Sequence, residues 1–326
     1  MSPTHSSLHA PIIGYDPGFG NTKVCVGGQI GLVPSHISIP RNIGMAAIGL
    51  KSAGRHATLV SFNGHEYAVG AGATAKGALR TSMDFSSLVS PERMALLYAA
   101  LAQVQNGPLG DAMLVVGLPV PLLEDLQQAQ TVMGQLKGLK TTHEYSVGGQ
   151  AVQFSIARIK VLAQPAGAYL DYAYDDDLQA RAGVSRCEVL VVDIGMNTLD
   201  VYVLKNGQVL ESFVGGAEVG VRRLLERVAT NGHDVMELDE ALRSGGLKFD
   251  SADLDGYLHE ILAALKRIAA NLKRFDVVIP CGGGSVVLGD RLRYALTAKG
   301  AAVHWPEDPV TANVRGLYKY GMKNAA

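Results

Sequence analysis

Apolar residues are densest between Val189 and Leu204, in the stretch VLVVDIGMNTLDVYVL. One apolar run leads to a short polar turn that contains Asp193, and a second apolar run follows the turn. Short runs of β-branched and other apolar residues, bounded by turn residues, are typical of buried strands. The pattern therefore predicts a strand, a tight turn and a returning strand, with a carboxylate at the turn.

A second copy of this pattern lies near the N-terminus, in Ile12 to Gly27, IIGYDPGFGNTKVCVG. When the two stretches are aligned without gaps, Asp16 falls on Asp193 and Lys23 falls on Asp200. Two such hairpins, about half the chain apart, indicate a duplicated fold.

Elsewhere the pattern alternates short strands with helices, as in α/β proteins. Asn63-Gly64 separates two strand-like runs and is typical of a hairpin turn. A strand that ends at Pro280 leads into the glycine-rich turn Cys281–Ser285. The spacing of apolar residues predicts helices over residues 91–105, 121–136, 215–228 and 253–274.

The two turns carry residues suited to binding a metal and a phosphate. Glycines let the backbone approach a ligand closely, and successive N–H groups in a turn can bind an anion. Asp16 and Asp193 would hold a hydrated Mg²⁺ that bridges phosphates, because carboxylates prefer the cation to the anion. Lys23, which only the first hairpin has, could reach the phosphates as a point charge. The alternative is that both are ordinary surface hairpins with turn-type Asp and Gly.

Two other polar segments are weaker candidates. Gly70–Gly77, GAGATAKG, is close to a dinucleotide fingerprint, but it lacks the acidic residue expected downstream and the GK[ST] of a phosphate loop. The acidic run Asp175–Asp177 lacks the spacing and glycine of a calcium loop. We expect neither to bind a ligand.

Composition and charge restrict the possible partners. A chain of 326 residues with 48% hydrophobic residues can form about two domains with sizeable cores. The net charge of −1 gives no overall attraction to nucleic acid or to an anionic membrane. Cys25, Cys187 and Cys281 form no CxxC motif, which fits a reducing cytoplasm. The start of the chain lacks the features of a signal peptide, and no apolar stretch is long enough to span a membrane.

Four segments have the order and spacing of the actin, heat-shock-chaperone and sugar-kinase superfamily. They resemble its first phosphate loop, its first connecting segment, its second phosphate loop and its adenosine motif. In that order they are DPGFGNTK at Asp16–Lys23, LAQPAGAYL at Leu162–Leu170, DIGMNTLD at Asp193–Asp200 and PCGGGSVVLG at Pro280–Gly289.

Within that superfamily the chain most resembles the ParM-type bacterial and archaeal actins. The segments that carry this resemblance are YAVGAGA at Tyr67–Ala73, VVGLPVPL at Val115–Leu122 and ANVRGLYKYG at Ala312–Gly321. The resemblance implies a duplicated actin-like (ribonuclease H-like) α/β fold, with two domains around a nucleotide cleft. Residues 12–164 would form domain I and residues 165–307 domain II, with a C-terminal helix in 308–326 packing back on domain I.

The resemblance also implies roles for individual residues. Asp16 and Asp193 would arrange the waters of Mg²⁺, and Gln164 and Asp200 would position the water that attacks ATP. Phe19, like Pro17, replaces a small or polar residue of the family. The residues implied in nucleotide binding are Gly18, Phe19, Gly20, Asn21, Thr22, Lys23, Gly195, Asn197, Thr198, Gly216, Glu218, Gly282, Gly283, Gly284 and Ser285.

The implied function is that of a cytoplasmic ATPase that polymerises into nucleotide-dependent filaments for plasmid or DNA segregation. Its partners would be other copies of itself and a DNA-binding adaptor protein, with no direct contact with nucleic acid or membrane. Two alternatives stay open. One is a small-molecule kinase or reactivating ATPase of the same superfamily that does not polymerise. The other is a nucleotide-binding scaffold that scarcely hydrolyses ATP.

Overall fold

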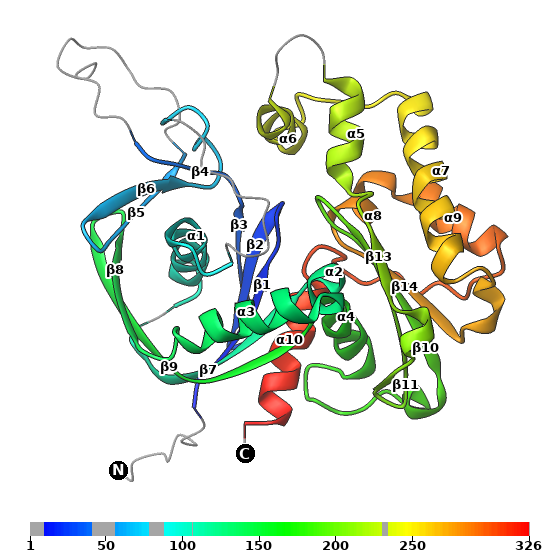
Figure 1. Ribbon diagram of the computed structural model, residues 1–326, viewed down its shortest axis with the longest axis horizontal. Coiled ribbons are helices and arrows are strands. Elements are labelled where there is room, and N and C mark those ends of the chain that lie inside the picture. The colour runs from blue at the N-terminus through cyan, green and yellow to red at the C-terminus, as the bar shows by residue number, and fades with distance from the viewer. Residues whose placement is uncertain (1–9, 41–55, 78–87, 106, 230–233, 326) are drawn as a thin grey trace, which may run out of the picture.

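The two halves of the chain each contain a β-sheet covered by helices, and the C-terminal helix lies between them (Figure 1). The structure is a computed structural model that describes residues 10–40, 56–77, 88–105, 107–229 and 234–325. Among these residues, no helix is both long and apolar enough to cross a membrane.

The first sheet has nine strands within the described residues, in the order β3-β2-β1-β7-β9-β8-β5-β6-β4. β1 pairs antiparallel with β2 and parallel with β7. The strands are β1 (Ile12–Pro17), β2 (Asn21–Val26), β3 (Gln29–Pro34), β4 (Ile37–Ser38), β5 (Thr58–Phe62), β6 (His65–Val69), β7 (Leu109–Leu118), β8 (Thr142–Val147) and β9 (Gln150–Ala163).

The second sheet repeats this central arrangement. Its order is β12-β11-β10-β14, with β13 also paired to β11, and β10 pairs antiparallel with β11 and parallel with β14. In register, Asp193 faces Asp200 just as Asp16 faces Lys23 in the first hairpin. This match confirms the predicted duplication. The strands are β10 (Glu188–Ile194), β11 (Leu199–Lys205), β12 (Gln208–Val209), β13 (Gly215–Ala217) and β14 (Val277–Cys281).

Helices cover the strands that carry the two turns, which explains their unbroken apolar sequences. All six residues of β1 are buried, as are the last six of β10. A strand covered on both faces has no solvent side on which polar residues would alternate. The helices outside the centre are α1 (Pro91–Ala102), α5 (Val221–Val228), α6 (Val235–Arg243), α7 (Ser251–Ile268), α8 (Gly283–Leu288) and α9 (Asp290–Ala298).

Two helices pack closely where the halves meet. α4 (Gln164–Ala173) crosses α10 (Ala312–Lys323), and a Cβ atom added at Gly316 would lie 1.7 Å from the carbonyl oxygen of Gly167. Only glycine allows this approach. Leu317 of α10 also packs against β1 and β7, while the predicted boundary after residue 164 lies at the start of α4. The division into domains stays a prediction.

Three predicted helices differ from the structure. Residues 121–136 form two helices, α2 (Val120–Glu124) and α3 (Leu126–Lys137), because Asp125 is extended and its carboxylate caps the amide of Gln128. The helix predicted over 253–274 ends at Ile268. Residues 215–217 form β13 on the edge of β11, and the helix begins only at Val221.

Candidate functional site

A cleft of about 260 Å³ is lined by residues from both halves of the chain. The turn between β1 and β2 and the turn between β10 and β11 both contribute to it. It therefore brings together the two carboxylate-bearing turns. The predicted site residues that line it are Asp16, Gly18, Phe19, Gly20, Asn21, Lys23, Gln164, Asp193, Gly195, Asn197, Thr198, Asp200, Gly282 and Gly283.

Asp16 lies at the end of β1 and has a partner for each carboxylate oxygen. Lys23 Nζ lies 2.8 Å from Oδ2, and Gln164 Nε2 donates to Oδ1 at 2.7 Å. Lys23 sits opposite Asp16 on β2, whereas Gln164 is the first residue of α4. An acid, a base and an amide are thus held together at the wall of the cleft.

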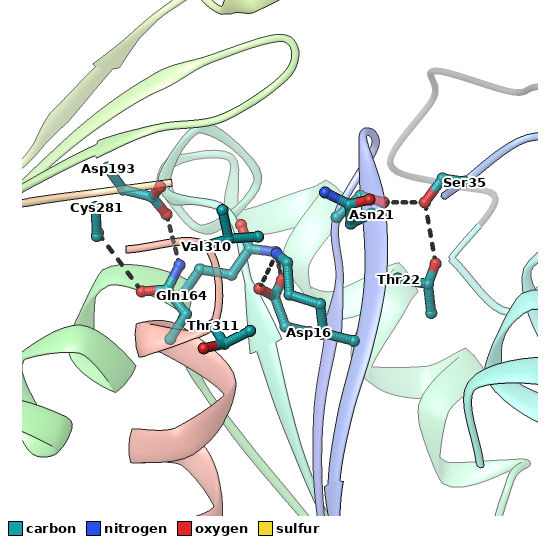
Figure 2. Close-up of polar contacts among 12 residues, drawn as sticks. Asp16, Asn21, Thr22, Ser35, Gln164, Asp193, Cys281, Val310 and Thr311 are labelled. Atoms are coloured by element: carbon teal, nitrogen blue, oxygen red, sulfur yellow. Dashed lines mark hydrogen bonds and ion pairs between the residues drawn. The ribbon is translucent and has the colours of Figure 1, made fainter. Parts of the chain in front are cut away.

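Asp193 occupies the matching position at the end of the β10 strand. Asn313 of α10 donates from Nδ2 to Asp193 Oδ2 at 2.7 Å. Burial raises the pKa of Asp193, and the negative charge of Asp16 raises it further. Figure 2 shows Asp193 next to Cys281, with Asp16 across from them. The two carboxylates are therefore close enough to oppose each other's ionisation.

Asp200 is a third buried acid of the cleft. The amide of Val120 donates to Oδ2 at 3.2 Å, and Oδ1 is buried without a hydrogen-bond partner among the described residues. Burial, followed by the charge of Asp193, raises the pKa of Asp200 to about 8. The group is then mostly neutral at pH 7, and its ionised fraction is a strong proton acceptor.

The carboxylates of Asp16 and Asp193 suit a magnesium ion. Mg²⁺ prefers oxygen ligands and retains several waters, and a cation would relieve the repulsion between the two carboxylates. Among the described residues, no three His, Cys, Asp or Glu side chains gather into a metal-binding cluster.

Comparison with known protein families gives a match in the first half of the chain. Residues 14–167 match the family model described as the N-terminal domain of actin-like proteins. These residues therefore belong to an actin-like N-terminal domain. A comparison with curated protein sequences gives no match.

Solved actin-like structures share the fold over nearly the whole chain. The archaeal actin homolog Ta0583 has a TM-score of 0.72 at 20% identity, covering 96% of this chain and 100% of that chain. A 15-stranded ParM filament from Clostridium botulinum gives 0.72 at 18% identity, covering 97% and 100%. Apo pSK41 ParM gives 0.70 at 16% identity, covering 97% and 98%. The predicted fold is thereby confirmed.

Within the part of the chain that the structure describes, some of the predicted site residues lie around the cleft without lining it. The Thr22 hydroxyl bonds to that of Ser35, and Ser285 donates to the carbonyl of Cys281 (Figure 2 shows Thr22 and Ser35). Gly284 packs against Ile194, where an added Cβ would lie 2.2 Å from a methyl carbon. These three residues therefore support the loops of the cleft on the side that faces away from it.

Gly216 and Glu218 lie in a neighbouring pocket of about 570 Å³. This pocket shares Asn197 and Thr198 with the main cleft, and Arg222 lines its wall. The two predicted residues are thus separated from the main cleft by the β10–β11 turn. Their expected proximity to a ribose stays a prediction.

Gly282 explains why the adenosine-type turn needs glycine. Its φ is +82°, and an added Cβ would lie 2.4 Å from the carbonyl oxygen of Ile194 and 2.5 Å from Asp193 Oδ1. A side chain here would push into the carboxylate and the backbone of the second turn.

Sequence reasoning missed three polar residues of the cleft wall, Asp239, Arg243 and Asn313. Asn313 lies in the ANVRG segment that carried the family resemblance, but no role was assigned to it. Asp239 and Arg243 lie four residues apart on α6, which is typical of an ordinary helical ion pair. No local pattern indicated that this pair faces the first turn.

Proposed function

We propose that the protein binds ATP with Mg²⁺ in this cleft, hydrolyses it slowly, and assembles into nucleotide-dependent filaments that segregate DNA. The observation that carries the proposal is that Asp16 and Asp193, on matching hairpins from the two halves, line one cleft together with Lys23 and Gln164. Such a set of residues suits a charged, metal-bound phosphate chain better than an apolar ligand.

Phosphate binding would rest on the two turns. Lys23 would attract the phosphates as a fixed positive charge, and the backbone from Gly18 to Asn21 would supply N–H donors. Asp16 and Asp193 would hold Mg²⁺ largely through water, and the bound ion would neutralise charge on the phosphates. Gly283 leaves open space beside its Cα, so a flat ribose or base could approach the backbone there.

Hydrolysis would use the two residues that can handle a water molecule. The Gln164 amide, held by Asp16, would orient the attacking water, and the partnerless oxygen of Asp200 would accept its proton. Orientation and proton transfer act only when the two halves hold the water close to the phosphorus. We therefore expect slow turnover in the monomer and faster turnover when neighbouring subunits fix the angle between the halves.

Filament formation has support from the related structures. Two solved neighbours are described as filaments, the 15-stranded ParM filament and the Alp12 filament. Repeated head-to-tail contacts without a closing rotation produce such polymers. The net charge of −1 fits an indirect attachment to DNA through an adaptor protein. The cytoplasm would be the place of action.

Light scattering and phosphate release, followed together after ATP is added, test this function. We expect a rise in scattering at high protein concentration, with faster phosphate release per subunit as filaments form. Asp193→Ala should abolish both, whereas Asp177→Ala, in an exposed loop, should change neither. A wild type that releases phosphate without any rise in scattering would refute polymerisation, and one that binds no ATP would refute the whole proposal.

A kinase is the second candidate, because the raised pKa and the partnerless oxygen of Asp200 also suit a general base that activates a substrate alcohol. ATP consumption that depends on an added alcohol, without scattering, would favour this reading.

A further inference from the structure

Helix α6 belongs to the second half of the chain but makes polar contacts with the first half. It stands on the side of the second half that faces the first (Figure 1). His36 Nε2 donates to Asp239 Oδ2 at 2.9 Å, and the two side chains are 0% and 3% exposed. Burial alone would raise the pKa of Asp239, but the hydrogen bonds from His36 and Arg243 outweigh it and lower the pKa. The helix therefore presents an ionised carboxylate to the first half.

Glu240, the next residue of α6, binds a second segment of the first half. Its Oε1 accepts from the amide of Gly72 at 2.7 Å, and its Oε2 accepts from the hydroxyl of Thr74. Both acceptor oxygens are thus used across the gap between the halves. These contacts also give a role to the GAGATAKG segment, in which no ligand was expected.

Arg243, at the end of α6, binds the first turn itself. It donates to the carbonyl oxygen of Gly20 at 3.0 Å and to Asn21 Oδ1 at 2.6 Å, while its Nε donates to Asp239 at 2.7 Å. Gly20, Asn21 and Arg243 all line the cleft. The helix therefore touches the same loop that would bind phosphate.

Phe19 adds an apolar contact to these polar ones. Its ring belongs to the first turn, but it packs against a cluster of the second half that includes Met196 and Leu238. The guanidinium of Arg93 lies over the same ring, 4.7 Å from its centre. Phe19, which replaces a small or polar residue of the family, thus links the first turn to α6 and its neighbours.

We propose that α6 is a latch that keeps the cleft closed over a bound nucleotide, with Glu240, Asp239 and Arg243 as positioning residues. This inference rests on the proposed nucleotide site. Helix α6 contacts the first turn, His36 and the segment that contains Gly72 and Thr74. The nucleotide therefore leaves only after these contacts break. Charge-assisted hydrogen bonds strengthen such a closure more than neutral ones do.

Release of a fluorescent ADP analogue, measured by stopped flow, tests the latch. Glu240→Ala should speed release about tenfold or more, because it removes two charge-assisted bonds. Thr74→Val removes only the hydroxyl donor and should have a smaller effect. In the double variant we expect no further increase over Glu240→Ala, since both residues belong to one contact. Glu211→Ala, an exposed charge of the same half, should leave the rate unchanged.

Small-angle scattering of the nucleotide-free variants gives a second, independent readout. The latch requires a larger radius of gyration in Glu240→Ala than in the wild type, at unchanged helix content by circular dichroism. Equal release rates, or equal radii, would overturn the inference. A wild type that binds no ADP analogue would refute the proposed function instead, while the comparison of radii would still decide whether α6 holds the halves together.

Discussion

Asp200→Asn should stabilise the nucleotide-free protein near neutral pH. The wild-type carboxyl has a pKa of about 8 in the folded state against 3.8 for an ordinary Asp. Because the folded pKa is raised, folding is favoured most below pH 4, and stability falls as the pH rises toward 8. Asparagine has the shape of the neutral acid and keeps an oxygen for the amide of Val120, but it does not titrate.

The size of the stabilisation by Asp200→Asn follows from the difference between the folded and the unfolded pKa of Asp200. At pH 7 the Asp200 carboxyl has lost its proton in the unfolded chain and has kept it in the folded chain. This pH lies about three units above the unfolded pKa, and each unit corresponds to about 1.4 kcal/mol. The penalty that Asp200→Asn removes is therefore at most about 4 kcal/mol. At pH 4 the two proteins should differ by less than about 1 kcal/mol, because the folded carboxyl is neutral and pH 4 is close to the unfolded pKa of 3.8.

Urea unfolding between pH 4 and pH 8, with EDTA and without nucleotide, measures this difference. We expect the gain from Asp200→Asn to grow with pH, and Asp177→Asn, an exposed substitution, to change the free energy of unfolding by no more than about 0.5 kcal/mol. The same variant should release phosphate about a hundredfold more slowly, since it has lost the proton acceptor. A gain that is equal at pH 4 and pH 7 would refute the assignment of a raised pKa.

Three further substitutions test other parts of the structure. Gly316→Ala should cost more than about 2 kcal/mol in urea unfolding, because its Cβ meets the Gly167 carbonyl, whereas Gly134→Ala in the open on α3 should stabilise by about 0.5 kcal/mol. Gln164→Ala should slow phosphate release about tenfold or more while leaving ADP affinity nearly intact, and an equal loss of both would contradict its role toward water. Asn313→Ala should weaken magnesium-dependent ADP binding in calorimetric titration, because it leaves Asp193 without its donor; unchanged affinity would show that this donor is dispensable.

The two hairpins could be predicted because their pattern is local. Unbroken apolar runs, interrupted by a turn with Asp and Gly, occur where a strand is buried on both faces. The ungapped alignment of Asp16 with Asp193 already contained the register that the structure shows. Duplication then implied that the two turns would face one cleft, as they do.

Contacts between distant segments could not be predicted in this way. His36 and Asp239 are 203 residues apart, and neither residue has a neighbouring pattern that points to the other. Residues 215–217 form a strand only because β11 offers its edge, since three residues carry too little periodicity to decide their structure. The break between α2 and α3 could have been predicted, because Asp125 is a capping residue within an apolar pattern. Such a residue is a local signal for the start of a new helix.

A crystal structure of the protein with Mn²⁺ and a non-hydrolysable ATP analogue tests the shared cleft most directly. Manganese stands in for magnesium, and its anomalous signal locates the metal. We expect one anomalous peak between the carboxylates of Asp16 and Asp193, with the phosphates beside Lys23. A metal bound elsewhere, or phosphates that touch only one of the two turns, would contradict the proposal that both halves bind a single nucleotide.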